Sequence, residues 1–447
     1  MSHSTMMLLI LFISVVGVIF LIMKARLHAF VALIIACLFL GLATGMPLAK
    51  IGSSIEAGMG GTLGFIATVL GLGTILGKML EVSGGAERLA RTMLDKLGTK
   101  NAHWAMMIVG FICGIPVFMQ VGFVLLIPLI FCIALETGMS IIMIGIPVAV
   151  SLTVVHCIVP PHPAAMAISL SLHADIGKVI IYGLLVGFPA AVIAGPLYCK
   201  YISKHVEISP DSNLFCKTER KTDAELPPFG ITLFTILLPL LIMVSKTIIE
   251  LNAPKDASFL PVVAFIGNPI TALVLSAIVS YWTLGLCRGF NKEDLLKFTE
   301  GCFGPVAGIL LIIGSGGAFN RVILDSGIGV EIGKMLLELS FSPLFLGWLM
   351  ALIMRVAIGS ATVAMMTAAG IIMPILVAYP NLDPALVAVA IGAGATGLSH
   401  VNDSGFWIVK EYFGLSLQDM FKTYTTSMTI VSVVALGGVF LLSKILG

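Results

Sequence analysis

The run Ser399-His400-Val401-Asn402-Asp403-Ser404-Gly405-Phe406-Trp407 decides how this chain is organised. It places an imidazole, a carboxamide, a carboxylate and a hydroxyl directly after the apolar, glycine-rich run Leu386–Leu398. An ionisable group at membrane depth is costly, and in that setting it marks a functional site. The first question is therefore whether the setting is a membrane.

Composition answers that question. The 447 residues are 58% hydrophobic and 11% charged, whereas soluble domains are roughly a quarter charged. The apolar runs are continuous and about 20 residues long, which predicts membrane-spanning helices, because barrel strands would alternate apolar and polar residues. The sequence thus predicts an all-α polytopic membrane protein in a lipid bilayer. It has no basic block that would suggest nucleic acid, and its eight cysteines, without a C-x-x-C pair, indicate neither a metal site nor a cofactor.

Two apolar runs are broken by glycine, proline or serine. Trp104–Leu135 is broken at Gly114-Ile115-Pro116 and again at Pro128, and Ser342–Ala378 is broken at Gly359-Ser360 and at Pro374. We interpret each run as a re-entrant hairpin, and a single kinked span is the alternative for the first. The opening run similarly interrupts Leu386–Val409.

A dense group of prolines breaks a further span, Ile141–Ser171. Pro160-Pro161-His162-Pro163 cannot lie in an intact helix, because proline rings clash with the preceding turn and lack an N–H donor. Irregular backbone at membrane depth is tolerated only where it lines a cavity or is buried in protein. We therefore expect a broken transmembrane helix at this position.

The two halves of the chain resemble each other, with matched residues at a nearly constant spacing. Segments rich in Lys and Arg, Gly84–Lys100 and Lys200–Pro228, are expected on the cytoplasmic side. Together with the first hairpin, this placement gives the two copies opposite orientations. The matched pairs are Gly73 with Gly316, Lys78 with Arg321, Ser83 with Ser326, Gly84 with Gly327, Pro128 with Pro374, and His156 with His400.

Inverted-topology repeats with two re-entrant hairpins and broken transmembrane helices are typical of secondary transporters, whose substrate sites lie near the midplane. The alternative is that the small residues only allow close helix packing. We expect N-terminal scaffold helices in 1–60, repeat 1 in 61–199, a cytoplasmic linker in 200–228, further scaffold helices in 229–300 and repeat 2 in 301–447.

The second hairpin break offers a binding site for an anion. A helix that starts at Gly359-Ser360-Ala361-Thr362 would present free N–H groups and a partial positive charge to a carboxylate. Ordinary capping without a ligand is the alternative. In the matching first break, Gln120 is the residue with a polar side chain. Arg355, just before the second break, could steer an anion or extend to the membrane interface.

Asp403 is the leading candidate for a proton-carrying residue, because burial favours the neutral form of a carboxyl group. A permanently ionised, structural carboxylate is the alternative. His156, His162 and His400 are other candidate proton carriers. The alternative is that each is a hydrogen-bonded histidine with a structural role. We expect Asp403 and His156 to couple protons, and we expect substrate contacts from Gly359, Ser360, Ala361, Thr362, His400, Asn402, Ser404, Gln120, Pro161 and His162.

An enzyme is disfavoured. His400, Asp403 and Ser404 lie on one short segment, and no strand-turn-helix elbow surrounds the serine. Sodium coupling is a competitor on mechanism, since Asn402, Asp403, Ser360 and Thr362 offer the oxygen ligands that a hard cation prefers. A passive anion channel is another, and it could not concentrate its substrate.

Several runs together resemble the gluconate permease family over nearly the whole chain. The resemblance implies a proton-driven symporter for gluconate or related sugar acids in the bacterial inner membrane. It also implies kinship with the ion-transporter superfamily, in which two hairpins surround the substrate and homodimers work by an elevator motion. The runs are Ser399–Trp407, Gly359–Ala364, Leu76–Leu80, Pro160–Pro163 and Phe265–Pro269.

The substrate is open between two branches of that family. Val155–Ala165 also resembles D-serine permeases, whereas Ser399–Trp407 looks more like the sugar-acid branch. Both substrates carry a carboxylate with a hydroxyl or amine nearby, so one site at a helix end could serve either.

Overall fold

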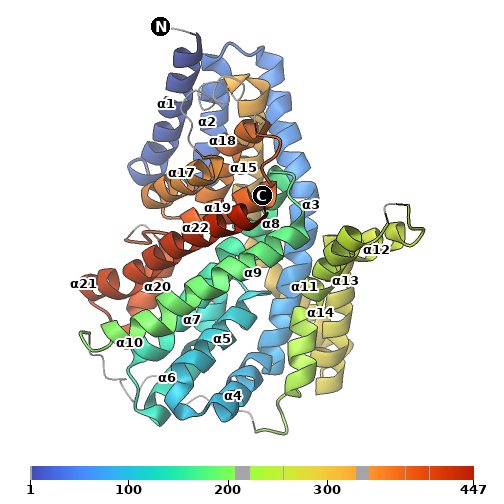
Figure 1. Ribbon diagram of the computed structural model, residues 1–447, viewed down its shortest axis with the longest axis vertical. Coiled ribbons are helices and arrows are strands. Elements are labelled where there is room, and N and C mark those ends of the chain that lie inside the picture. Colours follow the sequence, from blue (N-terminus) through green and yellow to red (C-terminus); the bar gives the residue numbers. More distant parts are fainter. Residues whose placement is uncertain are drawn as a thin grey trace.

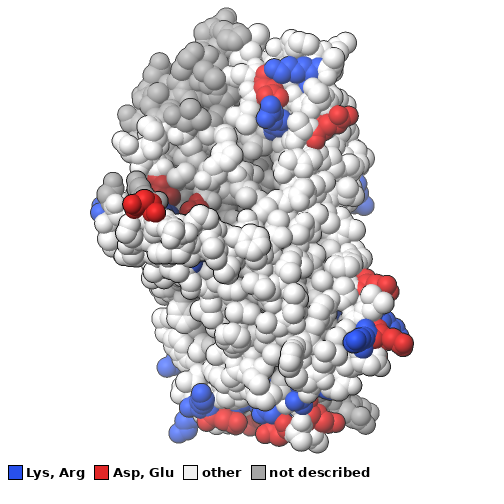
Figure 2. Space-filling model, turned by 90° about the vertical axis from the view of Figure 1, so that its right-hand side faces the viewer, with Lys and Arg blue, Asp and Glu red and all other residues white. Residues whose placement is uncertain are grey.

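The structure, a computed structural model, describes residues 3–206, 222–254, 256–328, 342–377, 379–401 and 403–446. Within these ranges the chain is helical without strands, and nine helices are long and apolar enough to cross a bilayer. Figure 2 shows charged side chains at the two ends of the molecule and at its left and right edges, with a largely uncharged surface between them. The predicted all-α, multi-pass membrane protein is confirmed.

In the described part of the chain, helices follow one another with connections that contain no strand (Figure 1). They are α1 His3–Met23, α2 Ala29–Ala43, α3 Leu48–Ser83, α4 Gly85–Leu97, α5 Ala102–Gly114, α6 Met119–Thr137, α7 Ile141–Ile158, α8 Pro163–Ser171, α9 Ile176–Val192, α10 Tyr198–Ile202, α11 Phe229–Asn252, α12 Leu260–Ile266, α13 Pro269–Ser280, α14 Lys292–Phe303, α15 Ala307–Asp325, α17 Pro343–Ile358, α18 Ala361–Val377, α19 Pro384–Thr396, α20 Ser404–Phe413, α21 Leu417–Met420 and α22 Thr426–Leu446. Short 3-10 or π turns include η3 Tyr281–Gly285, η4 Leu286–Arg288 and η6 Phe421–Thr425.

The first predicted hairpin is α5 followed by α6, with a turn at residues 115–118. Helix α5 runs parallel to α7, because Gly110 packs against Val148 and Gly114 against Leu152 and Val155. Helix α6 then returns towards the start of α5. The helix–turn–helix form supports the hairpin over the single kinked span.

The second hairpin, α17 and α18, repeats this arrangement at the other end of the molecule. Helix α17 runs parallel to α19, because Gly347 packs against Ile391 and Gly394 against the Trp348 carbonyl. In Figure 1, α5 and α6 lie in the lower half and α17 and α18 in the upper half. The two hairpins therefore face each other from opposite ends, as inverted repeats require.

Both predicted broken helices are present. Helix α7 ends at Ile158 and α8 begins at Pro163, with a cis peptide bond between Pro160 and Pro161. Helix α19 ends at Thr396 and α20 begins at Ser404. The two helices meet near their breaks, where a Cβ atom on Gly392 would lie 2.3 Å from the carbonyl oxygen of Cys157. This crossing lies deep in the protein, since 94% of an 18-residue apolar window in Ile141–Ser171 is buried, against 31% of the window in Thr5–Ile22.

The matched glycines end equivalent helices. Gly84 follows α3 and Gly327 follows α15, and both have φ of +79°. Glycine adopts this left-handed conformation without the clash that a Cβ would cause, which explains the residue at both helix ends. His156 and His400 are not equivalent, however, because His156 lies inside α7 and His400 in the longer break after α19. The predicted boundary between the N-terminal scaffold helices (1–60) and repeat 1 (61–199) falls inside a helix, because α3 runs unbroken across residues 60 and 61.

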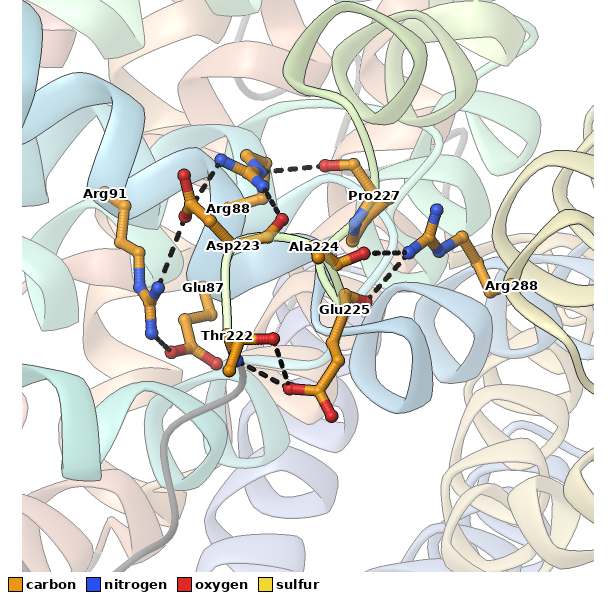
Figure 3. Close-up of polar contacts among 9 residues, drawn as sticks. All are labelled: Glu87, Arg88, Arg91, Thr222, Asp223, Ala224, Glu225, Pro227 and Arg288. Carbon is orange, nitrogen blue, oxygen red and sulfur yellow. Dashed lines mark hydrogen bonds and ion pairs between the residues drawn. The ribbon is translucent and has the colours of Figure 1, made fainter.

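The basic segments predicted to share one side lie together at the lower end of the molecule. Arg88 of α4 donates to the Asp223 carboxylate at 3.3 Å and to the Pro227 carbonyl at 2.9 Å. Arg288 of η4 donates to the carbonyls of Ala224 and Glu225 at 3.1 and 3.0 Å (Figure 3). The end of the predicted linker thus joins α4 to η4, while linker residues 207–221 lie outside the described part of the chain.

Candidate functional site

A cavity of about 230 Å³ lies where the two hairpin tips meet the break between α19 and α20. Both repeats contribute to its wall, and repeat 2 also contributes through α15 and η6. Its lining residues are Phe118, Met119, Gln120, Thr153, His156, Ile309, Ile312, Arg355, Ile358, Gly359, Ser360, Ala361, Thr362, Asp403, Ser404, Gly405 and Tyr424.

Three helices begin at this cavity: α6, α18 and α20. The first turn of each helix has backbone N–H groups without intrahelical partners, and together with the helix dipole they favour an anion. The Ser360 hydroxyl accepts a hydrogen bond from the Val363 N–H at 3.4 Å, and the Asp403 carboxylate accepts one from the Gly405 N–H at 2.9 Å. Gln120 Nε2 donates to Ser404 Oγ at 3.4 Å, which connects the starts of α6 and α20.

A buried ion pair lies in the cavity wall. Arg355 of α17 donates to Asp403 Oδ2 through Nη2 and to the Gly359 carbonyl through Nη1, and the Ser399 hydroxyl donates to the same Oδ2. The two charged side chains are only 4% and 7% exposed. Desolvating such a pair is costly unless further hydrogen bonds satisfy it, and the Gly359, Ser399 and Gly405 contacts satisfy part of this need.

The ion pair is not saturated. Within the described chain, Arg355 Nε is buried without a hydrogen-bond partner. Arg355 therefore points into the protein at the cavity, and the alternative that it extends to the membrane interface does not hold. Among the described lining residues, Arg355 is the one Lys or Arg and Asp403 the one acidic residue.

A histidine and a tyrosine stand beside this pair. His156 of α7 lines the cavity and has its Nδ1 atom buried without a partner among the described residues. Its ring lies 4.0 Å from that of His162, measured between centroids. Tyr424 of η6 is 1% exposed and also lines the cavity.

The structure gathers most of the predicted site residues at the cavity and places three elsewhere. Pro161 and His162 line an adjoining small pocket against α3, on the far side of Phe118. His400 turns away, with Nε2 2.9 Å from the Val356 carbonyl. Asn402 lies outside the described residues. The predicted residues that do line the cavity are Gln120, His156, Gly359, Ser360, Ala361, Thr362, Asp403 and Ser404.

Sequence reasoning missed several wall residues. Thr153 is a hydroxyl group within an apolar run, which was the one signal that could have pointed to it, whereas Tyr424 lies in the polar stretch Lys422–Thr426 and does not stand out there. The rest carry no such signal, because an apolar side chain that lines a cavity looks like one that packs against a helix or faces lipid. These are Phe118, Met119, Ile309, Ile312, Ile358 and the small residue Gly405.

Comparisons with known proteins agree with this architecture. The chain is 44% identical to the gluconate permease of Pseudomonas aeruginosa, covering 100% of this chain and 99% of that one. It is 47% identical to the D-serine transporter DsdX of Escherichia coli K12, covering 98% of each. The structure of MtrF from Neisseria gonorrhoeae shares the fold, with a TM-score of 0.64, 15% identity, and coverage of 90% of this chain and 85% of that one.

The model of the GntP family permeases matches residues 6–445. Almost the whole chain, including both hairpins and both broken helices, lies within this match. The chain belongs to the GntP permease family.

Proposed function

We propose that this protein is a proton-coupled secondary transporter that imports gluconate or a related sugar acid across the bacterial inner membrane. The observation that carries the proposal is the cavity where three helix N-termini and Arg355 surround one small space. Such a site suits a carboxylate, because free N–H donors, helix dipoles and a guanidinium all favour negative charge. The gluconate permease among the relatives supports the substrate class.

Different lining residues bind different chemical groups of the substrate. The carboxylate docks at the start of α18, where Ser360 and Thr362 flank the first turn. Gln120 and Ser404 donate to or accept from its hydroxyl groups, and Asn402 is proposed for the same role. Asp403 carries the proton, with His156 beside it. The unit that holds a hairpin and a broken helix moves against the other spans to open the cavity to alternate sides. A homodimer stays a prediction from the family resemblance.

D-serine is the second candidate substrate. The relative DsdX is named a D-serine transporter and is 47% identical to this chain. D-serine also presents a carboxylate, and its hydroxyl and ammonium groups are small enough for the same cavity. Sodium coupling is the competing energy source.

Labelled gluconate uptake into proteoliposomes tests the proposal. We expect accumulation above the external concentration under an inward proton gradient, no accumulation under a sodium gradient alone, and weak competition by excess unlabelled D-serine. Accumulation driven by sodium alone would contradict proton coupling. Flux that only equilibrates gluconate would favour a channel, and strong competition by D-serine would favour the second substrate.

A further inference from the structure

We propose that Asp403 is an internal substitute for the substrate carboxylate, which the entering substrate displaces from Arg355. The displaced Asp403 then takes up the transported proton. This inference rests on the proposed function, and it names Arg355 as the carboxylate receptor and ion-pair exchange as the coupling step. No covalent bond changes: one carboxylate replaces another on the guanidinium, and one proton moves from water to an Asp403 oxygen.

The geometry already contains a carboxylate on Arg355. The guanidinium binds Asp403 through Nη2 and the Gly359 carbonyl through Nη1, and Nε has no partner within the described chain. A guanidinium is a planar fork that can hold a carboxylate through two parallel hydrogen bonds. Here it holds Asp403 through one nitrogen only. A substrate carboxylate that engages the guanidinium at two atoms would therefore compete well with Asp403.

Charge balance then requires the proton. In the described cavity wall, one guanidinium faces one carboxylate, so the pair is neutral. A second carboxylate beside the same cation leaves an excess negative charge in a buried site, where an unpaired ion is costly. Two carboxylates that share such a site do not both stay ionised, so one binds a proton. Asp403 is the one that has lost its partner.

Other titratable groups face this pair from neighbouring elements. Helix α7 contributes His156 and Cys157, η6 contributes Tyr424, and α17 contributes Arg355 itself. His156 is the competitor for the proton, because it lines the cavity and its Nδ1 has no partner in the described chain. The test must therefore distinguish a carboxyl group from an imidazole.

The chain offers a matched control for Asp403. Asp383 likewise caps a helix, since its carboxylate accepts a hydrogen bond from the Ala385 N–H at 2.9 Å. It also forms an ion pair with Lys178 at 3.0 Å. It lies outside the cavity lining. Asp383→Asn therefore removes a helix-capping carboxylate and an ion pair without touching the proposed exchange.

The experiment is titration calorimetry of the purified full-length protein with gluconate, and with D-serine in parallel, in two buffers of different ionisation enthalpy. We expect uptake of about one proton per substrate bound, and a Kd that rises about tenfold per pH unit where Asp403 must be protonated to bind. Asp403→Asn should bind without proton uptake and without this pH dependence. Asp383→Asn should behave as the wild type.

Infrared difference spectra of the wild type identify the proton acceptor without any variant, should Asp403→Asn fail to fold. Substrate binding should produce a new band of a protonated carboxyl group. Binding without proton uptake, uptake that persists in Asp403→Asn, or an imidazolium signal in place of the carboxyl band would overturn the exchange while leaving the transport function intact. If neither gluconate nor D-serine binds, the proposed function fails and the exchange fails with it.

Discussion

Gln120 and Ser404 meet in the cavity wall, where Gln120 Nε2 donates to Ser404 Oγ at 3.4 Å. Gln120 lies in the first turn of α6, in the first repeat, and Ser404 begins α20, in the second. Residues far apart in the sequence therefore build one site from both repeats. A substrate that binds to both side chains contacts both halves of the molecule, so relative motion of the halves can open and close the site.

Gln120→Ala should weaken gluconate binding roughly 2- to 12-fold, the effect of losing one hydrogen bond of about 0.5–1.5 kcal/mol. Titration of purified protein gives the Kd. Gln418→Ala, on the exposed side of α21, is the control and should leave the Kd unchanged. Equal Kd values for Gln120→Ala and the wild type would remove Gln120 from the site.

Arg355→Gln should abolish measurable gluconate uptake, because the cavity loses the guanidinium and Asp403 is left as a buried, unpaired carboxylate. Arg355→Lys keeps the charge but loses the planar fork. Since a charged hydrogen bond contributes about 1.5–3 kcal/mol, we expect its KM to rise roughly 10- to 150-fold.

Arg321→Gln is the matched control for Arg355. Arg321 also pairs with an aspartate, Asp325, at 2.9 Å, but its side chain is 52% exposed and lies outside the cavity lining. Uptake by this variant should match the wild type. Full uptake by Arg355→Gln in the same assay would show that the substrate does not need the guanidinium.

Gly392→Ala should destabilise the crossing of α7 and α19. The added Cβ would lie 2.3 Å from the Cys157 carbonyl oxygen, so the backbone must shift, and overpacking of this kind costs about 1–3 kcal/mol. The unfolding temperature in detergent should fall. Gly437→Ala in α22 meets no atom within 4 Å and should leave that temperature unchanged or raise it slightly. Equal unfolding temperatures for the two variants would contradict the close crossing.

His162→Phe should leave the gluconate Kd unchanged and should not lower stability. His162 lines the pocket beyond Phe118, and both of its ring nitrogens are buried without partners in the described chain. Replacing an unsatisfied buried polar group by an apolar group of similar shape is neutral or stabilising. A large rise in Kd would instead place His162 in contact with the substrate.

The sequence was most informative where the chain is interrupted. The dense prolines Pro160-Pro161-His162-Pro163 and the Gly359-Ser360 turn interrupt helices, so the hairpins and broken helices were predictable. Single prolines misled, because α6 continues through Pro128 and α18 through Pro374, where further breaks were predicted. The paired glycines Gly84 and Gly327 mark helix ends because both adopt the left-handed conformation that favours glycine. The inverted arrangement followed from these breaks and from the basic segments of one side.

The tertiary contacts within the site were not predictable in this way. Arg355 and Asp403 lie on different elements, and an arginine near the end of an apolar run can extend to the interface or turn inward. Which of these occurs depends on the packing of α17 against α19. For the same reason, His162 and His400 looked like site residues in the sequence, although the structure places His162 in the pocket beyond Phe118 and turns His400 towards the Val356 carbonyl.

The most direct test of the central claim is substrate-driven proton movement in proteoliposomes that contain a pH-sensitive dye. Adding gluconate outside, with no imposed proton gradient, should acidify the lumen of vesicles that carry the wild type or Asp383→Asn. Asp403→Asn vesicles should show no acidification but should still exchange labelled gluconate for unlabelled gluconate. Gluconate entry by the wild type without acidification, or acidification that survives Asp403→Asn, would contradict the claim that Asp403 couples the carboxylate to a proton.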